Sequence, residues 1–228
     1  MGAHTKYADD RCFPALAARP PVRFAHPPTL TDAESAGLAD LLALLGCGEE
    51  AAAIAFHRLA ERGKFAPGTQ AALRLISDEE QVHDAWLTGL ASKLPPPTLL
   101  SETQAAARRF HARLGRGTPA EHLARIAAID AAVCMILSRL IAPRTALRAD
   151  RAVTQLISRI RHDESRHVAV ARNVVIESGM ATQLRDTAAH ARWSLGQLIA
   201  PFGSAFETLG VDPDRLAGNI AHMPNGLL

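Results

Sequence analysis

Residues 162–171 read HDESRHVAVA, and the interpretation of this stretch decides the fold expected for the whole chain. It lies within a long segment whose apolar residues recur at helical spacing. Glu164 and His167 stand three positions apart, so a helix places both side chains on one face, where an oxygen and a nitrogen can converge on one point. On its own, such a pair is typical of a solvent-exposed helix surface.

A second stretch, SDEEQVHDAW at residues 77–86, repeats this spacing with Glu80 and His83. Two copies near the middle of two long helical segments are much harder to explain as surface pairs than one copy is. Carboxylate oxygen and imidazole nitrogen together suit divalent metals such as iron and manganese. The repeated spacing therefore predicts a buried metal site shared between two helices.

The composition favours a helical globular chain. Of its 228 residues, 48% are hydrophobic and only 4% are aromatic, with abundant Ala and Leu. The formal net charge is +2 and no long basic run occurs, so we expect no nucleic-acid partner. The three cysteines form no CxxC pair, and no signal peptide or membrane-spanning apolar stretch is recognisable. These features predict a cytoplasmic protein with no membrane partner.

Glycine and proline positions divide the chain into helices, and no stretch shows the alternation of a strand. Four long helices and a connection long enough to cross between them indicate an all-α four-helix bundle. We expect helices over about 32–62, 68–92, 101–114, 119–141, 148–177 and 181–199.

Three regions follow from this pattern. Residues 1–30 are Pro-rich and form an extended arm, either draped over the body or partly disordered. Residues 31–179 form the four-helix bundle that carries the metal site. Residues 180–228 add further C-terminal helices.

A two-metal site in a helix bundle takes one more carboxylate from each of the two remaining helices. On one of them, Asp130 lies on the apolar stripe at a depth comparable with the repeated motifs, where an unpaired carboxylate would be costly. On the other, two neighbouring acids compete for the role. We favour Glu50, which shares a stripe with apolar residues, and keep Glu49 as the alternative.

The complete set resembles the metal site of the ferritin-like di-iron carboxylate superfamily, in its oxygenase and oxidase branch. Residues 163–167 match the D-E-x-R-H pattern of the bacterial multicomponent oxygenases in that superfamily. The resemblance covers about residues 32–177 and implies a ferritin-like bundle that holds two metal ions. The implied ligands are Glu50, Glu80, His83, Asp130, Glu164 and His167.

The resemblance also implies supporting residues around the ligands. In that family the acid before a ligand Glu hydrogen-bonds a ligand histidine, so Asp163 would orient His83 on the facing helix. Glu79 stands where Asp is usual in the first motif, and Arg166 belongs to the same outer layer. Three more side chains are candidates for the surroundings of the ligands or of a substrate cavity, although core packing is their simpler interpretation: His57, Cys47 and Cys134.

The resemblance implies an enzyme with two iron ions, or a Mn/Fe pair, that uses dioxygen to oxidise a small, largely apolar organic substrate. An external donor would supply electrons, and a homodimer is one option for its assembly. A bacterioferritin-like ferroxidase or iron-handling protein has the same ligand pattern and is the first alternative. A catalytically silent helical interaction protein is the second. The extra helices favour the enzyme, because they can wall a substrate pocket.

Overall fold

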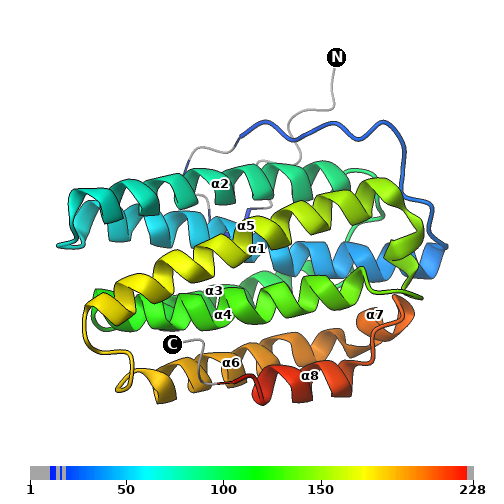
Figure 1. The fold of residues 1–228 in the computed structure, drawn as a ribbon. Coiled ribbons are helices and arrows are strands. Elements are labelled where there is room, and N and C mark those ends of the chain that lie inside the picture. Colours follow the sequence, from blue (N-terminus) through cyan, green and yellow to red (C-terminus); the bar gives the residue numbers. More distant parts are fainter. Residues whose placement is uncertain (1–10, 14–15, 17–18, 225–228) are drawn as a thin grey trace.

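The computed structural model describes residues 11–13, 16 and 19–224, and within these ranges all regular structure is helical (Figure 1). The prediction of an all-α chain is confirmed. The elements in chain order are α1 (Asp32–Arg62), α2 (Pro67–Ala91), α3 (Leu100–Leu114), α4 (Pro119–Leu140), η1 (Ala146–Ala149), α5 (Arg151–Glu177), α6 (Arg185–Ile199), η2 (Ala200–Phe202), α7 (Gly203–Thr208) and α8 (Pro213–Ala221).

Side-chain caps define the starts of three long helices. Thr31 and Thr118 each accept a hydrogen bond from the backbone N–H three residues later. The carboxylates of Glu34 and Glu121 in turn accept one from the backbone N–H of the cap residue, which completes a capping box. Asp150 caps α5 through the backbone N–H of residue 153. These local signals explain why the expected helix bounds agree with the observed ones to within a few residues.

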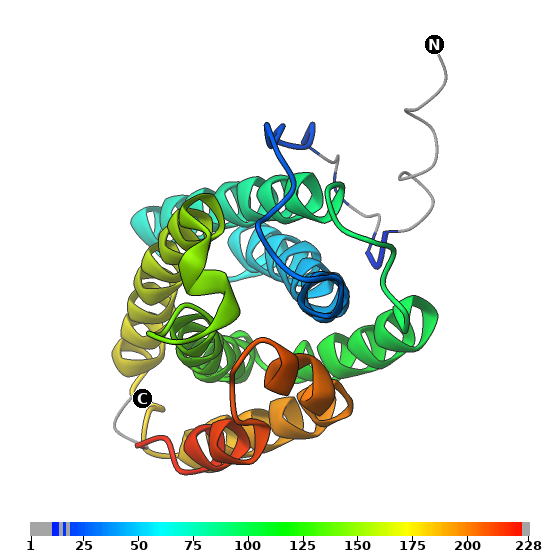
Figure 2. The same cartoon turned by 90° about the vertical axis from the view of Figure 1, so that its right-hand side faces the viewer.

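The four long helices are arranged as two antiparallel pairs, with α1 packed along α2 and α4 packed along α5 (Figure 1). Helix α3 connects one pair to the other and contacts α1, while α6 packs on α4. Viewed along the long axis, α1 lies inside a ring formed by the other helices (Figure 2). This arrangement explains why α1 has buried residues along its whole length.

The N-terminal arm crosses α2. The backbone N–H of Val22 donates to the carbonyl of Ala85 at 3.1 Å, and that of Thr29 donates to the Asp150 carboxylate at 3.0 Å. The arm approaches so closely that a Cβ atom at Gly89 would lie 1.9 Å from the Val22 carbonyl oxygen. The expected arm also includes residues 1–10, 14–15 and 17–18, which lie outside the described residues. The division of the chain into an arm, a four-helix bundle and a C-terminal extension stays a prediction.

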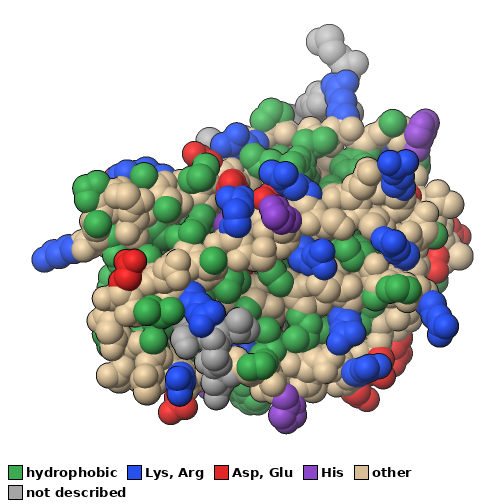
Figure 3. All heavy atoms as spheres, viewed as in Figure 1, with side chains coloured by type: hydrophobic (Ala, Val, Ile, Leu, Met, Phe, Trp, Pro, Cys, Tyr) green, Lys and Arg blue, Asp and Glu red, His purple; other side chains and the backbone are tan. Residues whose placement is uncertain are grey.

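The charged side chains on the face shown in Figure 3 are scattered among apolar and neutral ones rather than gathered into one continuous basic surface. Among the helices of the described residues, none has the length and apolar character needed to cross a membrane.

The contact between the arm and α2 gives a first prediction. Replacing Gly89 with Ala should lower the free energy of unfolding by roughly 1–3 kcal/mol, because the new methyl group overlaps a backbone oxygen and must displace the arm. Thermal unfolding followed by circular dichroism measures the change.

Gly46→Ala is the matched control, since Gly46 also lies inside a helix and a Cβ there meets nothing within 4 Å. It should stabilise the protein by up to about 1 kcal/mol through helix propensity alone. Equal stabilisation by both substitutions would contradict the close approach of the arm.

Candidate metal centre

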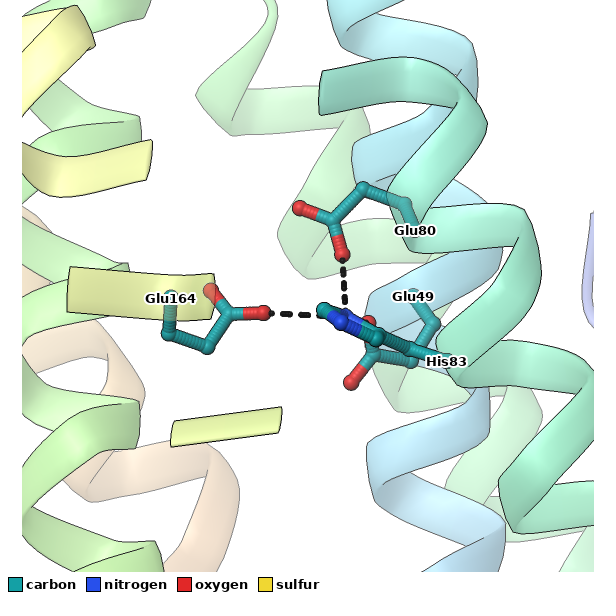
Figure 4. Close-up of side chains that lie close together, drawn as sticks. All are labelled: Glu49, Glu80, His83 and Glu164. Carbon is teal, nitrogen blue, oxygen red and sulfur yellow. Dashed lines mark hydrogen bonds and ion pairs between the residues drawn. The ribbon is translucent and has the colours of Figure 1, made fainter. Parts of the chain in front are cut away.

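Three helices bring four buried side chains together (Figure 4). Glu49 comes from α1, Glu80 and His83 come from one face of α2, and Glu164 comes from α5. One ligand atom from each residue lies within 4.8 Å of the others. This cluster has the carboxylate and imidazole atoms, the spacing and the burial that a divalent metal ion requires.

Glu80 and Glu164 each lie between the two buried imidazoles. One Glu80 oxygen is 3.3 Å from His83 Nδ1 and the other is 3.1 Å from His167 Nδ1. The corresponding distances for the Glu164 oxygens are 3.4 Å and 3.7 Å. Each carboxylate therefore presents one oxygen beside each imidazole, so the two histidines mark two neighbouring positions that share the carboxylates between them.

The outer nitrogen of each imidazole faces a second carboxylate. His83 Nε2 lies 3.4 Å from an Asp163 oxygen, and His167 Nε2 lies 2.9 Å from a Glu79 oxygen. Arg166 donates to both of these acids, at 2.8 Å and 2.9 Å. A carboxylate at Nε2 favours the tautomer with its proton there, which leaves the Nδ1 lone pair free for a metal. The expected contact between Asp163 and His83 is present, and Glu79 makes the equivalent contact from the other motif.

Burial and mutual contacts oppose each other in the titration of these groups. Burial lowers the pKa of His167, but the carboxylates of Glu164 and Glu80 outweigh this effect and raise its pKa to about 11. Burial raises the pKa of Glu49 and of Asp130 well above the usual carboxyl value, and neighbouring carboxylates raise both further. In the metal-free protein, protons on these groups therefore balance the buried negative charge.

Buried polar atoms in and beside the cluster favour the binding of a cation. Asp130 Oδ2 is buried and has no hydrogen-bond partner among the described residues, whereas Glu80 Oε1 and His167 Nδ1 have only each other, at 3.1 Å. A buried carboxylate oxygen without a partner, such as Asp130 Oδ2, is rare in folded proteins, because it loses its hydration without compensation. The Arg166 guanidinium does not supply the charge, since it bonds the outer acids Asp163 and Glu79. Oxygen and imidazole ligands of this kind fit iron or manganese.

The cluster opens into a cavity of about 860 Å³. The three carboxylates of the cluster, Glu49, Glu80 and Glu164, form part of the cavity wall together with Asp130. The rest of the wall is mainly Ala, Leu, Ile and Phe from α1, α3, α4 and α6. Asp130 thus lines the same cavity as the carboxylates of the cluster without being one of the cluster's four residues, and its role as a ligand stays a prediction.

The preference for Glu50 over Glu49 was wrong for the cluster, which contains Glu49. Glu50 instead binds the arm: it accepts from Arg11 Nε at 3.1 Å and from the Phe13 backbone N–H at 2.5 Å. Arg11 also pairs with Asp84 at 3.3 Å. Adjacent helix residues point about 100° apart, so only one of the two acids can face the cluster. Glu49 shares its stripe with the fully buried Phe56, and that stripe was the overlooked signal.

The three further candidates do not lie at the cluster or on the cavity wall. His57 is exposed on α1. Cys47 is buried beside Cys12 and Ala107, and Cys134 Sγ lies 3.7 Å from the carbonyl oxygen of Arg161. The cysteine that does line the cavity is Cys12, on the arm. The distance in sequence between the arm and the helices hid this contact.

Comparison with known proteins returns no match: no family model, no curated protein and no solved structure is significantly similar to this chain. The interpretation of the site therefore depends on its geometry.

The different positions of Glu49 at the cluster and Glu50 at the arm give a second prediction. Glu49→Gln should weaken the binding of Fe²⁺ or Mn²⁺ at least tenfold, because it removes a negatively charged ligand from the cluster. Replacing residues that only support the ligands of a metal already lowers the metal affinity roughly tenfold or more. Anaerobic calorimetric titration of the metal-free protein measures the affinity. Glu50→Gln is the control and should leave it unchanged. The reverse pattern would show that Glu50 is the ligand.

Two further histidines on the cavity wall give a third prediction. Burial lowers the pKa of His111 and of His122 to about 4, so the folded state keeps both neutral while the unfolded chain takes up protons near pH 6.5. The stability that they contribute is therefore lost as the pH falls from about 6.5 towards 4.

The double variant His111→Gln/His122→Gln should lose less stability than the wild type across this interval. Urea unfolding at a series of pH values between 7 and 4 compares the two proteins. Identical pH profiles would show that these histidines are not held neutral by burial.

Proposed function

We propose that this protein is a dioxygen-dependent oxidoreductase with a two-metal centre, either two iron ions or a Mn/Fe pair, of the ferritin-like di-iron type. The observation that carries the proposal is the position of the buried carboxylates on the wall of a large, mainly apolar cavity. The pairing of α1 with α2 and of α4 with α5, together with the connecting helix α3, supports this assignment.

Six residues would hold the two ions. His83 and Glu49 would bind the first ion, and His167 and Asp130 would bind the second. Glu80 and Glu164 would be shared, because each has one oxygen beside each imidazole. Four carboxylates would balance the charge of two divalent cations, which explains why acids outnumber histidines here.

Two such ions, when bound, supply electrons and Lewis acidity for the activation of dioxygen. The chain's own residues provide the surroundings. Asp163 and Glu79 orient the two imidazoles, and Arg166 holds both acids in place. The Leu, Ile and Ala side chains of the cavity wall exclude water and favour an apolar substrate.

An external electron donor follows from the chemistry. If one oxygen atom of dioxygen enters a C–H bond of the substrate, the other leaves as water, and this requires two electrons and two protons. The three free cysteines include no CxxC pair that could hold a redox metal, so the electrons would come from a separate reductase or a small electron carrier.

The cavity favours this function over the two alternatives. A ferroxidase that only handles iron has no use for a large apolar space beside the ligands. An inert helical interaction protein would gain nothing from burying four carboxylates, each of which lowers stability unless it is neutralised.

A fourth prediction tests this function. The double variant Glu80→Ala/Glu164→Ala should lose dioxygen consumption while its helical content stays nearly unchanged. The assay uses iron-loaded protein with a chemical reductant and an oxygen electrode, with circular dichroism for the fold. The exposed acid Glu102 on α3 supplies the control variant Glu102→Ala, which should keep the wild-type rate.

Consumption in the wild type should continue beyond the amount of iron present, because the reductant regenerates the centre. A rate in the double variant equal to that of the wild type would end the assignment. Consumption that stops once the added iron is oxidised would favour the iron-handling alternative.

A further inference from the structure

The two ends of the cavity differ chemically. At one end, Arg58 and Arg62 at the C-terminal end of α1 line the cavity and are solvent-exposed. His111 and His122 line the same end, beside the loop that joins α3 to α4. Leu, Ile and Phe side chains of α1, α4, α6 and α7 line the other end. The cavity therefore has a polar, basic mouth and an apolar interior.

The mouth lies at a similar distance from the buried carboxylates whether it is measured along α1 or along α4. On α1, Arg58 follows Glu49 by nine residues, about 14 Å along the helix axis. On α4, His122 precedes Asp130 by eight residues, about 12 Å. The cavity-lining residues of α1 between the acid and the arginine are all apolar: Ala51, Ala52, Ile54 and Ala55.

The apolar space continues beyond the cluster. Leu41, the most distant lining residue of α1 on that side, precedes Glu49 by eight residues, about 12 Å. Along α1 the cavity thus extends over about 26 Å from Leu41 to Arg58, with the cluster near its middle. An apolar space of this length suits an extended alkyl chain better than a compact ring.

The positive charge of Arg58 and Arg62 at the mouth favours an anionic head group on such a chain. Among the described residues, no carboxylate lies within ion-pair distance of Arg58 or Arg62, although Glu61 between them pairs with Arg74 at 2.9 Å. The acids that line the cavity are Asp130 and the three carboxylates of the cluster. Two guanidinium groups that pair with no carboxylate of the described residues, at the rim of an apolar cavity, are suited to bind an anion with two or more oxygens.

We propose that the substrate is a single-chain amphiphile with an anionic head group, of which a long-chain fatty acid is the simplest example. Arg58 and Arg62 bind the head at the mouth, and the alkyl chain extends past the carboxylate cluster towards the apolar end. This inference deepens the proposed function by naming its substrate class. It does not require metal for binding, so it is tested on the metal-free protein.

The fifth prediction concerns three ligands with the same alkyl chain, hexadecanoate, hexadecyl phosphate and hexadecanol, each titrated below its aggregation concentration. The wild type should bind at least one of the two anions at least tenfold more tightly than the alcohol, because hydrogen bonds between charged groups are stronger than those to a neutral hydroxyl. The anion that binds more tightly identifies the head group.

The variant Arg58→Gln/Arg62→Gln should lose at least tenfold in affinity for the anions and none for hexadecanol. Arg109→Gln is the matched control, since Arg109 is an exposed arginine on a wall helix that does not line the cavity. An equal loss for anions and alcohol, or no loss for either, would overturn the role of the arginines.

The outcomes separate this inference from the proposed function. Absence of binding by all three ligands would overturn the substrate class and leave the metal centre untouched. Binding of the anions by a protein that takes up no metal would leave the substrate class standing and remove the oxidoreductase.

Discussion

Four carboxylates buried beside two imidazoles place the strictest constraint on this molecule. Each buried carboxylate lowers stability by several kcal/mol unless a cation, a proton or a hydrogen bond compensates it. Glu80 and Glu164 achieve this by lying between His83 and His167, with contacts of 3.1–3.7 Å. Helices α2 and α5 must hold these side chains at a fixed depth and rotation, so the caps, the pairing and the connection of the long helices all serve one arrangement.

The same constraint explains the layer outside the imidazoles. Arg166 bonds both Asp163 and Glu79, and through these two acids it fixes the imidazoles of both motifs. The positive charge stays on the outer side, so the inner oxygens keep their negative potential for a metal. An arginine that pointed inward would neutralise the carboxylates of the cluster and so weaken their attraction for a metal cation.

Adjacent residues of α1 connect the cluster with the arm. Glu49 faces the cluster, while Glu50 binds Arg11 and the backbone of Phe13. Phe13 lines the cavity, so the anchor at Glu50 also positions one section of the cavity wall. The arm, the carboxylates and the cavity therefore depend on one turn of a single helix.

Much of this could be predicted from local patterns. Caps, glycines and prolines set the helix bounds, and the two Glu-x-x-His spacings predicted three of the four residues of the cluster, Glu80, His83 and Glu164. The choice between Glu49 and Glu50 failed because it depends on about 100° of rotation and on Arg11, a partner far away in the sequence. Cys12 was missed on the cavity wall for the same reason, since no helical period relates the arm to the helices. The basic mouth arises only when the ends of α1 and α3 meet.

Anomalous diffraction from crystals of the iron- or manganese-loaded protein tests the central claim most directly. We predict two adjacent peaks inside the protein, one beside Nδ1 of His83 and one beside Nδ1 of His167, with Glu80 and Glu164 between them. No peak at these imidazoles, or metal found only at the surface, would contradict the account.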